Sequence, residues 1–302
     1  MMDQRILRIA LLSNAAFSSL TGAVLLLAAP HVNTIIGLDA SGWLRALGAG
    51  LLFFAIFVIS VGARRRIHAL RALLISAADL GWVAGSLGLI IFAPSSLIPE
   101  GRAFVMGIAI IVLVFAVSQV VGVKRQLRET TPGMGAWRYC VAVDVEAPAG
   151  SMWRIVSDIG AISNYMPALK SSEICGGGAA GSGAVRVCAD VAGQRWGEEC
   201  IRFDDVARRF DLRFLTEGDG FPYPMSTMYG GWQVLAQGKG SRVIVWWSAT
   251  PSVRFVPQLL VVALMGAKID KTFPAVIQRM AAAALGRSMP TVAETGVVIL
   301  PC

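Results

Sequence analysis

Few side chains in this 302-residue chain could support catalysis. Its two histidines, His31 and His68, both lie in the first quarter. This excludes a Ser-His-Asp or Cys-His nucleophile system, and a histidine-based zinc site, in the second half. Glu198 and Glu199 look like a pair of catalytic carboxylates. If they lie on a strand, as we expect, they point to opposite faces and cannot act as acid and base on one substrate.

A glycine-rich segment, Gly176-Gly177-Gly178-Ala179-Ala180-Gly181, fits the pattern G-x-G-x-x-G. A dinucleotide site needs this pattern to open a helix whose N-terminus holds the pyrophosphate. The sequence that follows has the alternation of a strand, so the segment indicates a hairpin loop. We therefore expect no nucleotide, and no other cofactor.

The five cysteines show no C-x-x-C spacing, and we predict no metal site. They fit a reducing cytoplasm, in which most of them would be small buried side chains. Cys175, beside the glycines, is the one expected to be exposed. The full set is Cys140, Cys175, Cys188, Cys200 and Cys302.

The composition divides the chain into two parts. It is 55% hydrophobic and 15% charged, compared with about 45–50% and about 25% in soluble domains. The excess lies within residues 1–123, for which we predict an all-α bundle of four transmembrane helices. A membrane-spanning helix needs about 20 mostly apolar residues. The segments with this length are 7–29, 44–63, 69–93 and 103–122.

Arginine and lysine predict the orientation of these spans. Arg5 and Arg8, the run Arg64–Arg66, and Lys124 with Arg125 flank ends that we place in the cytoplasm. The prediction is a multi-pass protein of the inner (cytoplasmic) membrane, with both termini cytoplasmic. A cleaved signal peptide is the alternative interpretation of the first segment. The net charge of +8 divides almost equally between the two parts, which does not resemble a nucleic-acid-binding surface.

Asp79 is an acidic residue well inside a predicted span. It should face the bundle and find a polar partner, because an ionised carboxylate is costly in hydrocarbon. The candidate partners are Asn14, Ser118 and Gln119. One interpretation is an interhelical hydrogen bond and the other is a proton or ion relay. Glycine patterns around Gly48 and from Gly81 to Gly88 predict close helix packing.

After a linker at residues 124–136, the pattern changes to alternation with a period of two residues. We predict a strand from Trp137 to Val145, two short helices, six further strands and a long helix that ends near Leu285. The links between the later strands are too short for crossover helices, so the sheet should be antiparallel. The predicted strands are 169–175, 183–192, 195–204, 207–217, 225–236 and 241–249.

Residues 137–286 resemble the START-like helix-grip fold of the polyketide cyclase/dehydrase and lipid-transport superfamily (SRPBCC), followed by a tail at 287–302. The resemblance rests on residues 143–148, 153–158 and 165–167, and on Glu199 followed by Asp204-Asp205 and Arg208-Arg209-Phe210. It implies an α+β domain with an apolar cavity between an antiparallel sheet and the long C-terminal helix. The first part resembles small bacterial four-helix membrane proteins of unassigned function, through residues 79–83.

Strand parity predicts which side chains face that cavity. Val185, Val187, Ala189 and Val191 should point inward on one strand. Gly197, Glu199, Ile201 and Phe203 should do so on the next. An inward Glu199 would be salt-bridged to arginine or would anchor a ligand. The predicted ligand-binding residues are Glu199, Tyr165, Phe210, Phe214, Tyr223, Tyr229, Trp232, Trp247 and Phe273.

Our first interpretation is a membrane-anchored protein that binds an apolar lipid or polyketide-like ligand in a cytoplasmic cavity. One alternative is a cyclase/dehydrase-type enzyme that acts on a hydrophobic substrate in the same cavity. The other is a membrane scaffold or regulator. The expected partners are the membrane and an apolar small molecule, with no nucleic acid.

Overall fold

The structure is a computed structural model that describes residues 4–37, 40–93, 96–218, 220–290, 298–300 and 302. Contacts divide the chain into two compact units, Met2–Gln126 and Leu127–Cys302. Asp219 of a predicted turn, and residues 291–297 and 301 of the predicted tail, lie outside the described residues.

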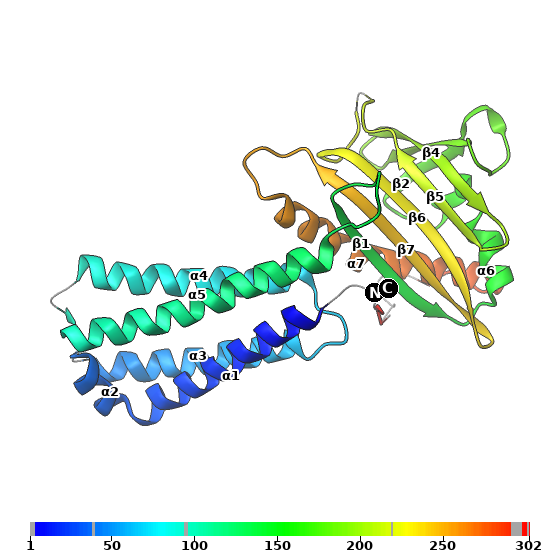
Figure 1. Ribbon diagram of the computed structural model, residues 1–302. Coiled ribbons are helices and arrows are strands. Elements are labelled where there is room, and N and C mark those ends of the chain that lie inside the picture. The colour runs from blue at the N-terminus through cyan, green and yellow to red at the C-terminus, as the bar shows by residue number, and fades with distance from the viewer. Residues whose placement is uncertain (1–3, 38–39, 94–95, 219, 291–297, 301) are drawn as a thin grey trace. The chain divides into compact units, whose positions relative to one another are not determined.

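The described residues of the first unit contain five α-helices, and the long ones lie side by side in Figure 1. They are α1 (Arg5–Leu27), α2 (Ala29–Ile36), α3 (Ser41–Gly62), α4 (Ala69–Phe92) and α5 (Pro99–Leu127). In this part of the chain, α1, α3, α4 and α5 are long and apolar enough to cross a membrane. The predicted spans therefore correspond to helices. However, α2 was not predicted, and α5 continues four residues into the expected linker.

Glycine allows two of these helices to touch through their backbones. A Cβ atom on Gly22 of α1 would lie 2.8 Å from the carbonyl oxygen of Gly48 of α3. This confirms the predicted close packing at Gly48. The prediction was wrong for Gly50, Gly81, Gly85 and Gly88, because an added Cβ there meets no described atom within 4 Å. The glycines of α4 leave open space rather than a helix contact.

The second unit is a seven-stranded antiparallel sheet with the order β1-β7-β6-β5-β4-β3-β2. The strands are β1 (Trp137–Val145), β2 (Leu169–Ile174), β3 (Val185–Asp190), β4 (Arg195–Asp204), β5 (Arg209–Phe214), β6 (Met225–Gln237) and β7 (Gly240–Pro251). Each lies within two residues of the predicted range at both ends, or within three for β5. The glycine-rich segment begins with the short 3₁₀ turn Cys175–Gly177 and leads into β3, as expected of a hairpin loop.

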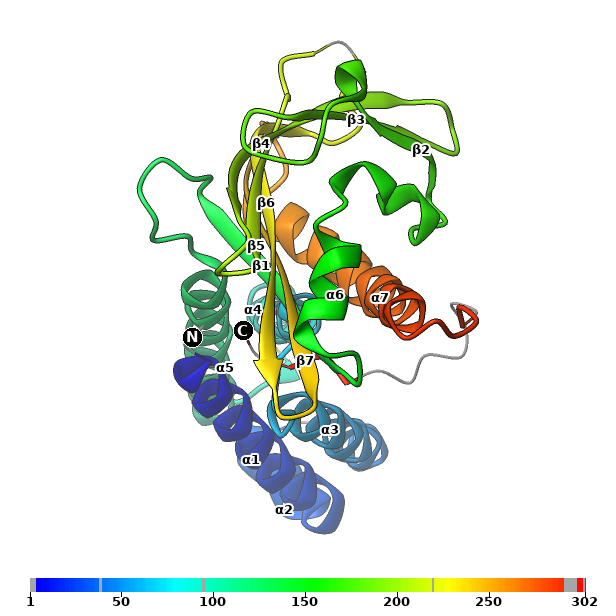
Figure 2. The ribbon, with the colours of Figure 1, turned by 90° about the vertical axis from the view of Figure 1, so that its right-hand side faces the viewer.

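Two α-helices, α6 (Ala149–Val156) and α7 (Gln258–Ala284), lie on the same face of this sheet in Figure 2. A 3₁₀ turn, Ile159–Asn164, follows α6. The helix α7 is held against β1 by Tyr139. The Tyr139 hydroxyl donates a hydrogen bond of 2.5 Å to Asp270 of α7. The Tyr139 ring also packs so closely on Gly266 of α7 that a Cβ atom there would overlap it. This arrangement is the predicted helix-grip fold.

The end of the chain returns to β1. Leu300 donates a backbone hydrogen bond of 2.9 Å to Ala142, and Cys302 forms a disulfide with Cys140. The sequence analysis did not predict this pairing, because it depends on a tail that follows α7 and brings the two cysteines together across 162 positions. As expected, Cys175 is exposed, and Cys188 and Cys200 are free and buried.

Candidate functional site

A cavity of about 310 Å³ lies in the second unit between the sheet and α7. Strands β3 to β7 form one wall, and the other wall comes from α7 and from the segment that precedes β2. The lining is mostly apolar. Its apolar members include Ile162, Met166, Leu169, Leu212, Met228, Val245, Met265 and Ile269.

The register of the sheet places two charged residues on the wall of this cavity. Arg186 of β3 lies opposite Glu198 of β4, and Glu198 lies opposite Phe214 of β5. Residues that lie opposite each other on neighbouring strands share a face of the sheet. Arg186, Glu198 and Phe214 therefore form a row across three strands, and all three line the cavity.

Arg186 and Glu198 form a buried ion pair. Each side chain is only 4% exposed. Arg186 donates from Nη2 to Glu198 Oε2, and from Nη1 to the carbonyl of Ile159 at 2.7 Å. Trp196 donates from Nε1 to Glu198 Oε1 at 2.7 Å, so both carboxylate oxygens are engaged. The Arg186 Nε is buried and finds no hydrogen-bond partner among the residues that the structure describes.

Glu199 points away from the cavity, so its predicted inward orientation was wrong. It forms an exposed ion pair with Arg213 of β5, 2.7 Å from Arg213 Nη2 to Glu199 Oε2. The reason is an irregularity in β4, where the register shifts between Cys200 and Arg202. A β-bulge reverses the parity of the residues beyond it. Phe203 follows the bulge and faces the side of the sheet that carries α6, as predicted, where it stacks on Phe210. Glu199 precedes the bulge and therefore faces the opposite side.

The same correction applies to β3. Arg186, Cys188 and Asp190 line the cavity, whereas Val187 lines a depression beside the glycine-rich loop. Of the four residues predicted to point inward, Val191 lines the cavity. The prediction assumed that the more apolar set of a strand is the buried set. Here the inner set contains charged residues that neutralise each other across the strands.

Five of the predicted ligand-binding residues line the cavity. Trp247 and Phe273 meet edge to face, with ring centroids 4.4 Å apart. Phe273 also packs against Trp232, at 6.0 Å. Tyr223 meets the ring of Trp196 at 6.1 Å and keeps 36% of its surface exposed. The five are Phe214, Tyr223, Trp232, Trp247 and Phe273.

The other predicted residues lie elsewhere in the unit. Phe210 packs against Trp153 of α6, and it is among the most completely buried side chains. Tyr229 pairs in register with Arg213, on the same outer face as Glu199. Tyr165 ends the 3₁₀ turn and does not line the cavity. Whether any of the nine residues binds a ligand stays a prediction.

The sequence reading missed Arg186, Glu198 and Trp196 as members of the site. A signal was present in the short connection between β3 and β4. Asp190 and Gln194 close a tight turn through the backbone, in which Gly193 has φ +88°. A turn centred there fixes the antiparallel register, and this register sets Arg186 opposite Glu198. Recognition of that turn as a hairpin would have identified the ion pair.

Two titratable groups of the cavity, Cys188 and Tyr223, favour their neutral forms. Burial, with the nearby charge of Glu198, raises the pKa of the Cys188 thiol to about 12. The same two causes raise the pKa of the Tyr223 hydroxyl. A thiol and a phenol in this state are not nucleophiles at neutral pH. Among the described residues, no group of three His, Cys, Asp or Glu side chains could hold a metal ion.

Comparison with known proteins covers the second unit. Residues 136–285 match the profile of the family described as polyketide cyclase / dehydrase and lipid transport. No curated protein matches the chain.

Several solved structures resemble this unit at low sequence identity. They include Ara h 8.0201 (15% identity, 50% of this chain and 98% of that chain, TM-score 0.39). The Zhui aromatase/cyclase from a Streptomyces species is 18% identical (49% and 93%, TM-score 0.40). A protein of solved structure from Thermus thermophilus is 22% identical (48% and 98%, TM-score 0.40).

The family profile and the helix-grip architecture agree with each other over the same residues. Residues 136–285 are therefore a START-like domain of the polyketide cyclase/dehydrase and lipid transport family.

Proposed function

We propose that the START-like domain binds one compact apolar molecule that carries an oxygen-bearing end. In this proposal, α1, α3, α4 and α5 anchor the domain at the cytoplasmic face of the inner membrane. The proposal rests on one buried hydrogen-bond donor. Arg186 Nε is a buried donor without a described partner, and its side chain forms part of the wall of an apolar cavity.

The cavity supports a ligand of this kind in two ways. Its volume of about 310 Å³ is at the lower end of the range of about 300–1,000 Å³ for small-molecule sites. It therefore suits a compact ring-bearing or single-chain molecule. A ligand oxygen that accepts from Arg186 Nε would satisfy a donor whose isolation otherwise costs about 1–3 kcal/mol. The aromatic rings of Trp232, Trp247 and Phe273 would contact its apolar body.

The geometry favours binding over a cyclase-type reaction. Acid-base catalysis needs a group that exchanges a proton near neutral pH. Both oxygens of Glu198 already accept hydrogen bonds, from Arg186 and Trp196. Cys188 and Tyr223 retain their protons, as their raised pKa values indicate. These groups are therefore suited to orienting a bound molecule rather than to transferring a proton.

A binding titration on the full-length protein in detergent tests the proposal. The probe is 2-naphthoate, which combines an apolar ring system with a carboxylate, and saturation-transfer NMR follows its binding. The variant is Arg186→Met combined with Glu198→Met, which removes both charges together and leaves no unpaired buried ion. The matched control is Arg213→Met with Glu199→Met, the same exchange on the outer face of the sheet.

We expect saturable binding by the wild-type protein and by the outer-face control. The inner-face variant should lose at least about tenfold in affinity, as expected when a charge-assisted hydrogen bond is lost. Equal affinity in the two double variants, or no saturable binding by the wild-type protein, would refute the proposal. Mass spectrometry of extracts of the purified protein should also identify a co-purified apolar molecule with an oxygen-bearing end.

The membrane orientation is tested separately. In the proposed arrangement all four apolar helices cross the membrane, so the chain would return to the side on which it started, and the arginine clusters predict that side to be the cytoplasm. A fluorescent-protein fusion after Cys302 should fluoresce, and an alkaline phosphatase fusion at the same place should be inactive. The opposite pair of results would place the START-like domain outside the cytoplasm.

A further inference from the structure

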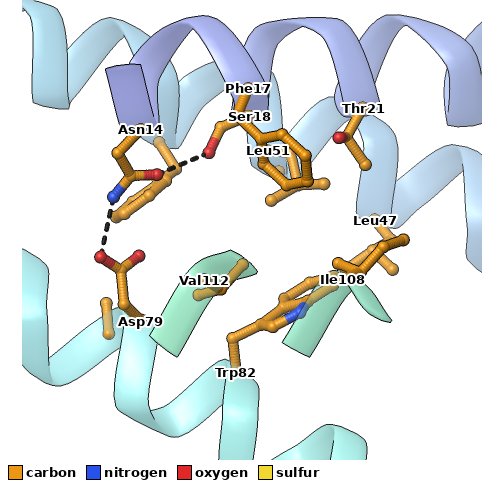
Figure 3. A pocket seen from close by; sticks show the side chains of 13 residues that line it. Asn14, Phe17, Ser18, Thr21, Leu47, Leu51, Asp79, Trp82, Ile108 and Val112 are labelled. Carbon is orange, nitrogen blue, oxygen red and sulfur yellow. Dashed lines mark hydrogen bonds between the residues drawn. The ribbon is translucent and has the colours of Figure 1, made fainter. Parts of the chain in front are cut away.

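A second cavity lies within the helical unit, apart from the START-like domain. It has a volume of about 230 Å³ and is lined by residues from α1, α3, α4 and α5. Figure 3 shows Asn14, Ser18, Asp79 and Trp82 around it. Most of the remaining lining is aliphatic or aromatic, including Phe17 and Phe54. A polar group in such a place needs a partner, because it is shielded from water.

Asp79 is 3% exposed and is held in one orientation by two amides. Asn14 Nδ2 donates to its Oδ2 at 2.7 Å, and Gln119 Nε2 donates to the same oxygen at 3.0 Å. These bonds confirm two of the three partners that the sequence suggested. Both bonds end on Oδ2. Neither of the hydrogen bonds to Asp79 reaches the other oxygen, Oδ1, and in Figure 3 this oxygen points away from Asn14 toward the cavity.

Neighbouring hydroxyls fix the direction of both amides. Ser18 donates to the Asn14 side-chain oxygen at 3.1 Å, and Ser76 donates to the Gln119 side-chain oxygen at 2.9 Å. With their oxygens occupied, the amides present their N–H groups to Asp79. The network therefore makes Asp79 an acceptor, and no described Lys, Arg or His is paired with it.

An independent observation comes from Trp82, one helical turn after Asp79. Its indole Nε1 is buried and has no hydrogen-bond partner among the described residues. The same side chain lines the cavity. The cavity thus offers an acceptor without a donor, Asp79 Oδ1, and a donor without an acceptor, Trp82 Nε1. An unsatisfied buried donor such as Trp82 Nε1 is rare in folded proteins and calls for a physical explanation.

From this arrangement we propose that the cavity binds a small organic amine that also carries a hydrogen-bond acceptor. The ammonium group contacts Asp79 Oδ1, the acceptor takes the Trp82 N–H, and the aromatic rings of the lining contact the apolar body. A protonated amine is attracted to both a carboxylate and aromatic faces. The site does not suit a hard metal ion, which prefers about six oxygen ligands. The side-chain oxygens of Asn14 and Gln119 are engaged by serines instead.

The test uses the full-length protein in detergent, with 2-amino-1-phenylethanol as the probe. Its uncharged counterpart is 1-phenylpropan-1-ol, in which a methyl group replaces the ammonium. Saturation-transfer NMR measures both affinities. The wild-type protein should bind the amine saturably, and at least about tenfold more tightly than the alcohol, because only the amine pairs with the carboxylate. Asp79→Asn should abolish that preference. Trp82→Phe, which removes the N–H and keeps an aromatic ring, should weaken binding severalfold.

A filling variant provides a test that does not alter the polar network. Gly50 lines the cavity, and a Cβ atom there meets nothing within 4 Å, so Gly50→Leu projects into open space. Gly85→Leu is the matched control, since Gly85 of α4 has the same freedom and does not line the cavity. We expect Gly50→Leu to abolish binding and Gly85→Leu to retain it. Equal binding of the amine and the alcohol, amine binding unchanged by Asp79→Asn, or no saturable binding by the wild-type protein would overturn the proposal.

Discussion

Arg186 and Glu198 lie opposite each other on β3 and β4, and their ion pair is almost completely shielded from water. The adjacent residue, Glu199, forms an exposed ion pair with Arg213 on the other face of the sheet. Two neighbouring glutamates thus take part in the same kind of interaction in opposite environments. The contrast makes them a matched pair for measuring what burial adds to an ion pair.

The first prediction concerns stability. Glu198→Gln leaves the Arg186 charge buried without its counter-ion, which should lower the free energy of unfolding by about 3–5 kcal/mol. Glu199→Gln removes a solvent-exposed pair and should cost about 0–1 kcal/mol. Urea unfolding of the full-length protein, followed by tryptophan fluorescence, measures both values. Similar losses for the two variants would contradict the assignment of Glu198 to the inside.

The second prediction concerns pH. Cys188 has a pKa of about 12 in the folded protein, against a reference value of 9.0. Between about pH 9 and 12 the unfolded chain loses this proton and the folded protein keeps it, so stability must fall as the pH rises. From pH 8 to pH 10 the wild-type protein should lose about 1.4 kcal/mol more than the Cys188→Ala variant. An identical pH dependence in the two proteins would show that Cys188 is not shielded.

The third prediction concerns the disulfide between Cys140 and Cys302. Reduction of the purified protein, or the Cys302→Ser substitution, should lower the free energy of unfolding by about 2–4 kcal/mol. The proposed function places this domain in the reducing cytoplasm, so we expect both thiols to be labelled when intact cells are lysed directly into denaturant with N-ethylmaleimide. Denaturation is needed because Cys140 is buried. The bond should then form after purification in air. Peptide mapping distinguishes the two states, and Cys302→Ser, which has no such bond to reduce, is the control for the reductant.

The fourth prediction concerns the contact that holds α7 against β1. A Cβ atom on Gly266 would overlap the Tyr139 ring, so Gly266→Ala should destabilise the protein by about 1–3 kcal/mol through overpacking. Gly150→Ala is the control, because Gly150 is also helical and its added Cβ meets nothing within 4 Å. That variant should be neutral or should gain up to about 1 kcal/mol. Thermal unfolding of both variants gives the comparison.

Local patterns were enough to identify most elements of the fold. Charge-free stretches of membrane-spanning length marked α1, α3, α4 and α5, and alternation with a period of two marked every strand of the sheet. These signals lie within short windows of sequence, so no distant contact is needed to recognise them. The short helix α2 and the end of α5 at Leu127 were missed, because neither ends at a clear change in composition.

The site depended on relationships that no short window contains. Parity failed for Glu199 because the bulge after Cys200 reverses the faces of β4, and a bulge has no reliable signature in composition. The hydrogen bonds of Asp79 with Asn14 and Gln119 could be predicted, because few other polar side chains lie in the predicted spans. The unsatisfied Trp82 N–H was not foreseen, because it depends on which atoms of other helices come near it.

The sequence by itself determined that the chain joins four apolar helices to an antiparallel sheet with a long final helix, because composition and periodicity are local properties. Only the tertiary structure decided which glutamate is inside. Strand register, a bulge and the pairing of Arg186 with Glu198 together make burial of a charge possible. The disulfide between Cys140 and Cys302 also depends on the tertiary structure, because it forms only when the tail returns to β1.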